Sequence, residues 1–507
     1  MNLATILARN ARSHGDRCAV VFDGQRLTWR ELDGRVNRLG HALAALGIGR
    51  GDAVAFVLPN GLELLALYWA CARLGAVSVP LSPMLRGAGL ASLIADSGAR
   101  CVIAHRDVLA AVDAARDALS GVSVGHFLSV DAYHASGWRD LATLCAEAPP
   151  TALPDAGVGA DDAFNIIYSS GTTGLPKGIV LSHGVRAWYG ALFSGCFRIA
   201  PESMVLQTGS LVFNGALLMM FACFHAGATL VLHRGFDASA FIDAVEAERV
   251  SHCMLVPAQT IAVLRTPGFE PERLASLSML LSLGAPMLRQ YKDELAACLP
   301  GRYHELYGLT EGFVTVLDRG DVARKPDSVG VPLPLFEMRI VDDEGHDVSP
   351  GEVGEIIGRG PILMQGYHRQ PDLTAAAIRD GWLYSGDLGR VDADGFLHLV
   401  DRKKDLIISA GINVYPRDIE EILATHPAVR ECAVFGVADD RRGETPVAAV
   451  LLHDGETVTA IALAEWLNAR VAAAYQRVRE VRIQDDFPRS TAGKTLKREL
   501  RERWQDG

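Results

Sequence analysis

The sequence lacks the cysteine patterns of a disulfide-stabilised or metal-binding protein. Its nine cysteines are spread singly along 507 residues, without a CxxC pair or a Cys/His cluster at metal-binding spacing. An odd number of unpatterned cysteines is typical of reduced thiols in a cytosolic protein. We therefore expect a cytoplasmic location, with most of these side chains acting as small core residues.

The sequence also lacks a basic balance and a clear membrane span. Its net charge is −11, from 49 basic and 60 acidic residues, whereas non-specific nucleic-acid binding depends on basic patches. The N-terminal segment has no continuous apolar core of the secretory type. The one apolar stretch of 18 residues, Gly215–Leu232, contains His225 and Gly227 and predicts a buried helix followed by a buried strand. We expect neither a nucleic-acid partner nor an integral membrane segment.

What is present is the pattern of a large α/β protein. A chain of 507 residues is too long for one simple core. In the first third, helices such as Leu62–Leu74, and one that begins at the capping box Thr28–Glu31, alternate with apolar strands, which predicts a doubly wound parallel sheet. Short strands broken by glycines from Val331 to Phe396 predict a small antiparallel barrel or sandwich. After Asp401 the pattern is that of a compact α+β module.

One loop between two strand-like runs, Ser169 to Gly178, has the composition of a phosphate-binding site. It holds three glycines, four hydroxyl side chains and one lysine. Glycine lets backbone N–H groups approach an anion, and hydroxyls and lysine add donors. The loop is not of the Walker A type, because Lys177 is followed by Gly178 rather than by Ser or Thr. The expected polyphosphate ligands are Ser169, Ser170, Gly171, Thr172, Thr173, Gly174 and Lys177.

A second segment, Glu305 to Glu311, carries complementary chemistry. The ring of Tyr307 beside Gly308 can form a platform for adenine, since glycine permits close approach. Thr310 offers a hydroxyl to a phosphate, and Glu311 offers a hard oxygen ligand of the kind that Mg²⁺ prefers.

Together with four further segments in the same order, these two resemble the signature motifs of the acyl-adenylate-forming superfamily, in its acyl-CoA synthetase (fatty-acid and aryl-CoA ligase) branch. The resemblance extends from about Leu27 to Lys497. It implies an α/β fold with a large N-terminal domain (residues 1–401) of two doubly wound subdomains plus a small β-barrel. A hinge at 402–404 and a mobile α+β C-terminal domain (405–507) complete the expected architecture. The four further segments are Ser282–Pro286, Trp382–Gly389, Asp401–Pro416 and Pro488–Lys494.

The resemblance also implies roles for residues in those segments. Gly284, Ala285 and Pro286 would lie along the adenosine and the acyl group, with Glu305, Tyr307 and Gly308 beside the nucleotide. Asp387 would accept the ribose hydroxyls, Arg402 would contact the ribose, and Gly411 would face the site during thioester formation. Lys494 would be the catalytic lysine that bridges the substrate carboxylate and the α-phosphate, with Thr310 and Glu311 as catalytic partners. Lys177 is interpreted as holding the departing pyrophosphate.

The expected acyl pocket is mainly apolar and aromatic, and its candidate residues are Trp188, Tyr189, Phe213, Asn214, Leu283 and Tyr307. Many members of the family carry an aromatic-His pair where Phe213 and Asn214 stand. Asparagine cannot titrate near neutrality, but its amide could still orient the carboxylate. Leu283 stands where the family more often has a small residue. Arg186 is the nearest cation, so a monocarboxylic acid is favoured over a dicarboxylate.

The function expected from these motifs is ATP-dependent acid–CoA ligation. MgATP would convert a monocarboxylic acid into acyl-AMP, and coenzyme A would then take the acyl group. A medium- or long-chain fatty acid is the first expectation, with an aryl or alicyclic acid as the alternative. A stand-alone adenylation enzyme that loads a carrier protein, a luciferase-like oxygenase and a non-catalytic nucleotide-binding scaffold stay open. The oligomeric state is also open, a homodimer included.

Overall fold

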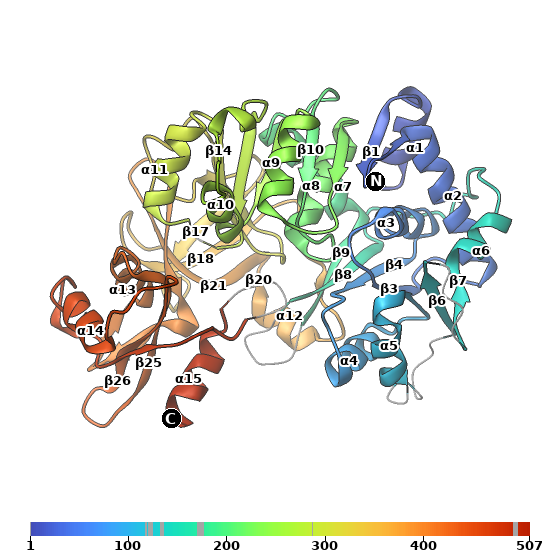
Figure 1. Cartoon of the computed structure of the whole chain (residues 1–507). Coiled ribbons are helices and arrows are strands. Elements are labelled where there is room, and N and C mark those ends of the chain that lie inside the picture. Colours follow the sequence, from blue (N-terminus) through green and yellow to red (C-terminus); the bar gives the residue numbers. More distant parts are fainter. Residues whose placement is uncertain are drawn as a thin grey trace. The chain divides into compact units, whose positions relative to one another are not determined.

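The computed structural model describes residues 2–116, 119, 125–131, 136–169, 177–285, 287–489 and 495–506. The chain divides into two compact units, which are described separately (Figure 1). Unit 1 comprises Met1–Glu337 and Arg359–Leu383, and unit 2 comprises Met338–Gly358 and Tyr384–Gly507. The expected hinge at 402–404 lies within unit 2, and the borders 1–401 and 405–507 stay a prediction.

The first sheet of unit 1 has eight strands in the order β19-β9-β8-β4-β3-β5-β6-β7. The pairs from β8 to β7 along this order are parallel, whereas β8 with β9 and β9 with β19 are antiparallel. Strands β8 and β9 are thus the antiparallel hairpin strands that flank the predicted phosphate loop in the sequence. The strands are β3 (Ala53–Val57), β4 (Val77–Leu81), β5 (Cys101–His105), β6 (His126–Val130), β7 (Arg139–Asp140), β8 (Ala163–Ser169), β9 (Lys177–Ser182) and β19 (Gly366–Tyr367).

The second sheet of unit 1 has nine strands in the order β16-β15-β14-β13-β12-β10-β11-β1-β2. The run from β14 to β1 is parallel, as alternating helices and strands predict. Its strands are β1 (Cys18–Phe22), β2 (Gln25–Thr28), β10 (Met204–Gln207), β11 (Thr229–Leu232), β12 (His252–Leu255), β13 (Met279–Leu283), β14 (Tyr303–Gly308), β15 (Val314–Leu317) and β16 (Val331–Pro332).

An aromatic core joins the buried helices of unit 1. Trp69 of α3 stacks on Phe224 of α8 with ring centroids 4.9 Å apart, and Trp29 of α2 meets Phe224 edge-on at 5.0 Å. The Thr28–Glu31 capping box is present at the start of α2, as predicted. The helices are α1 (Thr5–Ser13), α2 (Trp29–Ala45), α3 (Leu62–Leu74), α4 (Gly87–Ser97), α5 (Leu109–Arg116), α6 (Leu141–Glu147), α7 (His183–Cys196), α8 (Asn214–Ala226), α9 (Ala238–Ala247), α10 (Pro257–Leu264), α11 (Arg289–Cys298) and α12 (Pro371–Ala377).

The apolar stretch Gly215–Leu232 folds as the sequence predicts. Helix α8 ends at Ala226, its C-cap Gly227 has a left-handed φ of 74°, and strand β11 begins at Thr229. Within the described part of the chain, no helix has both the length and the apolar character of a membrane span.

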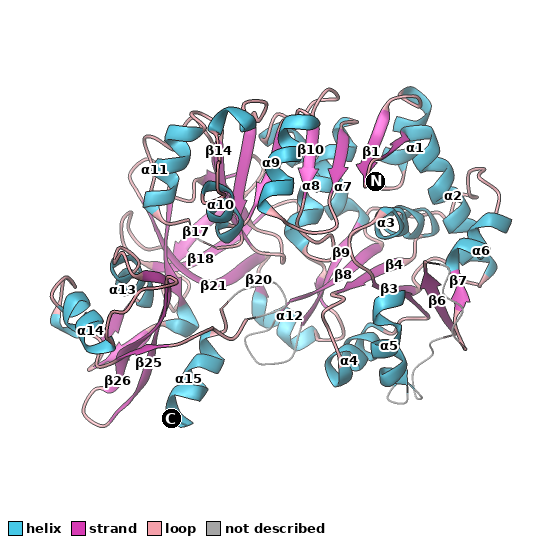
Figure 2. Ribbon diagram, in the orientation of Figure 1, coloured by secondary structure: helices cyan, strands magenta, loops and turns pink. Residues whose placement is uncertain are grey.

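Unit 2 contains two sheets (Figure 2). In the first, β17, β18, β21 and β22 are neighbours. The short β20 pairs with Trp382 and Leu383 at the start of β21, and these paired residues are assigned to unit 1. In the second, the order is β24-β23-β26-β25, with β27 beside β26 and apolar cores on both faces. The bounds are β17 (Glu337–Val341), β18 (Gly354–Arg359), β20 (Ile378–Arg379), β21 (Trp382–Val391), β22 (Leu397–Arg402), β23 (Ile407–Ser409), β24 (Ile412–Val414), α13 (Pro416–Leu423), β25 (Val429–Asp439), β26 (Gly443–Leu452), α14 (Ala460–Asn468), β27 (Val481–Ile483) and α15 (Lys497–Asp506). The predicted α/β class, with an α+β C-terminal part, is confirmed.

Candidate active site

The predicted phosphate loop leaves strand β8 at Ser169 and enters β9 at Lys177, which pair with each other in the antiparallel register. The short strand β19 extends this hairpin on its other side and places Tyr367 opposite Ile179. The Lys177 ammonium consequently lies 5.1 Å from the centre of the Tyr367 ring. The predicted ligands Ser170, Gly171, Thr172, Thr173 and Gly174 lie outside the described residues.

Tyr367 connects this hairpin to the second predicted motif. Its hydroxyl donates a hydrogen bond to Oε1 of Glu311 at 2.9 Å. Burial and the neighbouring Glu311 charge raise the pKa of Tyr367, so that it is a neutral donor at physiological pH. Lys177, Tyr367 and Glu311 thus form a row of a cation, a phenol and a carboxylate.

The Glu311 end of this row depends on a close backbone approach. The N–H of Met364 donates to the Glu311 carbonyl at 2.8 Å. Gly312 has a φ of 121°, and a Cβ placed there would come within 2.2 Å of the Ile362 carbonyl oxygen. Only glycine fits this position, because both the space and the φ exclude a side chain.

The other nucleotide-site predictions lie where strands β13 and β14 end. Leu283 pairs with Leu306 in this parallel pair, so Gly284, Ala285, Gly308 and Thr310 follow the carboxyl ends of neighbouring strands. That edge of a parallel sheet is where α/β proteins place ligands. Tyr307, Gly308, Thr310 and Glu311 are all at least partly exposed, as nucleotide contacts require, and Pro286 lies outside the described residues.

Glu305 differs from its neighbours because its side chain is buried and already bonded. The carboxylate lies 2.5 Å from the Lys292 ammonium and accepts from the Tyr303 hydroxyl at 3.3 Å. Its exposed fraction is 2%. This geometry favours a role in holding β14 against α11, and direct contact of Glu305 with a nucleotide stays a prediction.

The predicted acyl-pocket residues centre on the loop before α8. Tyr68 and Asn60 anchor this loop through the Leu211 carbonyl at 2.7 Å and the Leu211 N–H at 2.8 Å. Phe213 and Asn214 follow and are half-buried.

The α8 start also meets the end of β13. A Cβ on Gly215 would come within 3.0 Å of Leu283 Cδ1 and 3.8 Å of the Met254 sulfur. Phe213, Asn214 and Leu283 are therefore brought together. Among the described residues, Arg186 and Tyr189 of α7 bond to Asn214, whereas the predicted Trp188 is a half-buried neighbour on that helix.

In unit 2, the predicted ribose contacts face each other across a strand pair. Asp387 of β21 is opposite Arg402 of β22, and their side chains approach to 3.4 Å. An aspartate beside a glycine predicts a turn, but Asp387 lies within the continuous strand β21. The neighbouring Gly386 has a positive φ of 71° inside this strand.

The remaining unit 2 predictions lie on connecting segments. Burial lowers the pKa of Lys404 in the predicted hinge, although Asp405 opposes this shift. Gly411 and Ala410 form the turn between β23 and β24, both with positive φ. The predicted catalytic Lys494 lies outside the described residues.

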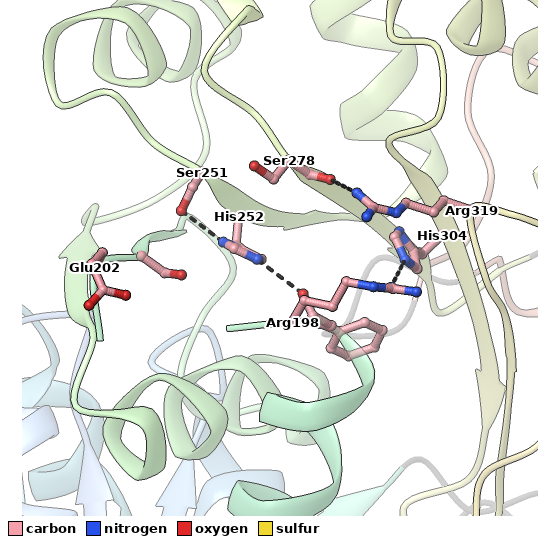
Figure 3. Close-up of a pocket in the computed structure, with 9 residues that line it drawn as sticks. Arg198, Glu202, Ser251, His252, Ser278, His304 and Arg319 are labelled. Atoms are coloured by element: carbon pink, nitrogen blue, oxygen red, sulfur yellow. Dashed lines mark hydrogen bonds between the residues drawn. The ribbon is translucent and has the colours of Figure 1, made fainter. Parts of the chain in front are cut away.

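A separate cavity of about 390 Å³ lies at the opposite, amino-terminal ends of β10, β12, β13 and β14 (Figure 3). Burial lowers the pKa of His304 there to about 4 and also lowers that of His252, so both are neutral near pH 7. Arg198 at its rim is paired with Asp318 at 2.9 Å. None of the predicted site residues that the structure describes lines this cavity.

Sequence reasoning did not identify Tyr367 or the role of Arg186. Tyr367 reaches Lys177 only through the pairing of β19 with β9, which are far apart in the chain. No local pattern encodes that pairing. For Arg186, a charged residue in the otherwise apolar stretch of α7 was a usable signal.

Comparisons with known proteins agree with this geometry. The family model for the AMP-binding enzyme matches residues 7–368, and that for the AMP-binding enzyme C-terminal domain matches residues 418–494. A feruloyl-CoA synthase from an Amycolatopsis species is 38% identical over 98% of each chain. An indoleacetate–CoA ligase from Aromatoleum aromaticum is 36% identical over 99% of this chain and 98% of its own.

Solved structures show the same relationship. ATP-bound MatB from Rhodopseudomonas palustris superposes with a TM-score of 0.90 at 30% identity, covering 100% of this chain and 99% of that one. An o-succinylbenzoate CoA synthetase from Bacillus subtilis, solved with its acyl-adenylate intermediate, has a TM-score of 0.87 at 28% identity, covering 98% and 97%. The family predicted from the motifs is therefore confirmed. The chain belongs to the AMP-binding enzyme family and is an ATP-dependent, AMP-forming acid–CoA ligase.

Proposed function

We propose that this ligase acts on a compact monocarboxylic acid with an apolar body, and that an aromatic acid is its preferred substrate. The observation that carries the proposal is the packing at the acyl side of the site. The Leu283 side chain lies against Gly215, where a Cβ would be only 3.0 Å away. A branched side chain at this point shortens the space available to a long alkyl chain.

The relatives support the same order of substrates. Those named for feruloyl-CoA and indoleacetate are 38% and 36% identical to this chain, whereas a long-chain-fatty-acid–CoA ligase from Mycobacterium tuberculosis is 31% identical. The medium- or long-chain fatty acid expected from sequence thus becomes the second candidate. A carrier protein is a second candidate acceptor beside coenzyme A, because a fatty acid–carrier-protein ligase from Streptomyces coeruleorubidus is 32% identical.

The residues of unit 1 fit the binding of MgATP. Glu311 offers a half-buried carboxylate, one oxygen of which accepts from Tyr367. The described residues contain no group of three or more His, Cys, Asp or Glu side chains that could hold a metal ion. A single carboxylate such as that of Glu311 suits Mg²⁺, which is typically held by one or two carboxylates together with substrate phosphates and water. Bound there, the ion would neutralise phosphate charge.

In this proposal, two lysines take part in the first half-reaction, and each contacts a different group. Lys177, oriented over the Tyr367 ring, would hold the pyrophosphate as it leaves. Lys494 would bridge the acid carboxylate and the α-phosphate and lower their repulsion. Coenzyme A would then attack the acyl carbonyl after unit 2 residues around the 402–404 hinge reorient, with Gly411 facing the acyl-adenylate. Asp387 and Arg402 would bind the ribose.

A pyrophosphate-release screen tests the substrate assignment. The purified protein is incubated with MgATP and one acid at a time, from cinnamates, arylacetates and benzoates to fatty acids of increasing chain length. We expect the highest kcat/KM with an aromatic acid and a decline beyond medium chain length. Maximal activity with a long-chain fatty acid, with malonate or with an amino acid would reject the proposed substrate class.

The acceptor and the state of the protein need separate measurements. Coenzyme-A-dependent AMP formation, run beside a purified carrier protein, identifies the acceptor. The cytoplasmic location and a homodimer stay predictions. All nine cysteines are free thiols in the structure.

A further inference from the structure

Arg186 is a buried cation that bonds to neutral groups. It lies on the first turn of α7, and its exposed fraction is 0%. Its Nε donates to Oδ1 of Asn165 at 2.9 Å, and its Nη1 donates to Oδ1 of Asn214 at 2.8 Å. The guanidinium also lies 4.7 Å from the Tyr189 ring centre and 5.5 Å from that of Phe221.

The positive charge of Arg186 has no counter-ion within the described part of the chain. Burial lowers the pKa of Arg186, and the neighbouring Tyr189 and Tyr68 raise it. No carboxylate of a described residue contributes to this shift. The buried Nη2 makes no hydrogen bond to any described residue. Arginine stays protonated in proteins, so this charge is not relieved by deprotonation.

The contacts of Arg186 fix the orientation of the Asn214 amide. A guanidinium has donors and no acceptor, so the atom of Asn214 that faces it must be the oxygen. The amide nitrogen then faces the other way and donates to the Tyr189 hydroxyl at 3.1 Å. One N–H of that nitrogen is left for a further acceptor. Asn214 is half-buried beside Phe213 and close to Leu283, where the acid is proposed to bind.

We propose that Arg186 is a positioning and specificity-determining residue that acts through Asn214. It holds the amide so that an N–H donor faces the carboxylate of the acid substrate. It also maintains a positive potential there, because its charge is desolvated and unpaired. The site thus selects for an anion that none of the described residues supplies. This inference rests on the proposed function only in placing the acid beside Asn214.

A double-mutant cycle tests the coupling. Arg186→Met, Asn214→Ala and the double variant are assayed for acid-dependent pyrophosphate release with the best acid of the wild type. We expect Arg186→Met to lower kcat/KM about 30-fold, mainly through KM for the acid, in the Asn214 background. In the Asn214→Ala background the same substitution should change kcat/KM less than 3-fold. An equal loss in both backgrounds would show that Arg186 does not act through Asn214 and would overturn the inference.

Two further measurements make the result decisive. The KM for MgATP should change less than 2-fold in all three variants, since Arg186 acts on the acid alone in this proposal; an equal rise for both substrates would contradict it. Arg73→Met is a matched control, because Arg73 also bonds to an asparagine, Asn37, but is paired with Asp33. Its kcat/KM per folded molecule should stay within 2-fold of wild type. Absence of pyrophosphate release by the wild type with every acid would instead reject the proposed function.

Discussion

Two buried cations of unit 1 are balanced in different ways. Lys292 on α11 lies 2.5 Å from the Glu305 carboxylate, and both side chains are less than 10% exposed, at 7% and 3%. Arg186 on α7 is at least as buried but bonds to the amide oxygens of Asn165 and Asn214. The chain itself neutralises the first charge and leaves the second unneutralised by any described carboxylate.

The difference separates a structural charge from a functional one. In a buried ion pair, each partner neutralises the charge of the other, so no net charge is left to attract a ligand. A buried cation held by amides and aromatic rings keeps its potential for an incoming anion. We therefore expect changes at the Lys292 pair to affect stability, and changes around Arg186 to affect the handling of the acid.

The largest effect is expected from Glu305→Ala. It leaves the Lys292 ammonium buried without a carboxylate, which typically costs about 3–5 kcal/mol. Urea or thermal unfolding measures this loss. As a control, the pair Lys292→Met and Glu305→Leu together should be much less destabilising, because no unpaired charge remains. A loss below about 1 kcal/mol in Glu305→Ala would contradict the role given to the pair.

Asn214→Asp should make the Arg186 site resemble the Lys292 site. The new carboxylate would pair with Arg186, so we expect little loss of stability. It would also repel the substrate carboxylate and remove the N–H donor, and we expect kcat/KM for the acid to fall roughly 100-fold, or about 2.7 kcal/mol. Asn165→Asp is the matched control, because Asn165 also bonds to Arg186 but lies on strand β8. We expect its loss of kcat/KM to be several-fold smaller than that of Asn214→Asp. Equal losses in the two variants would contradict the specific role of Asn214.

His183 is a buried titratable group that, unlike Arg186, can lose its positive charge by deprotonation. It is 0% exposed, three residues before Arg186 on α7, and burial lowers its pKa to about 4. The unfolded chain, with a histidine pKa near 6.5, binds more protons between these values, so stability falls as the pH drops from about 6.5 to 4. Between pH 7 and pH 5 this group should contribute a loss of about 2 kcal/mol. His183→Gln should flatten the pH dependence of unfolding by that amount, and an unchanged slope would show that His183 does not titrate in this way.

The smallest effect is expected from Tyr303→Phe. The Tyr303 hydroxyl donates to Glu305 at 3.3 Å, beside an ion pair that stays intact. Its removal should cost about 0.5–1.5 kcal/mol of stability, typical of one hydrogen bond, with no change in KM for the acid. Tyr189→Phe removes the hydroxyl that accepts from the Asn214 amide. Its main effect should be on binding, with the KM for the acid rising a few-fold. Denaturant midpoints and kinetics on both variants distinguish the two tyrosines.

Much of the fold follows from local patterns in the sequence. The capping box at Thr28, the helix Leu62–Leu74 and the helix–glycine–strand unit around Gly227 are present as expected. Such elements are encoded within short windows by spacing, caps and glycine positions. The motifs also fall at the ends of β8, β13 and β14, and the roles given to their residues stay predictions.

The partners of individual side chains could not be predicted in the same way. Tyr367 meets Lys177 because β19 joins a sheet edge formed much earlier in the chain, and Lys292 meets Glu305 because α11 packs beside β14. Asp387 lies in a strand although an aspartate beside a glycine is typical of turns. In each of these examples, packing between segments that are distant in the sequence determines the contact, and local sequence patterns do not predict such packing.

The most direct test of the account is acid-dependent pyrophosphate release from MgATP in the absence of coenzyme A, followed by addition of coenzyme A. An aromatic monocarboxylic acid should support a burst of pyrophosphate, and coenzyme A should then convert the acyl-AMP to acyl-CoA and AMP with continued turnover. Arg186→Met should weaken the response to the acid and leave the response to MgATP unchanged. Release of pyrophosphate that does not depend on the acid, or formation of ADP and phosphate in place of AMP, would contradict the account.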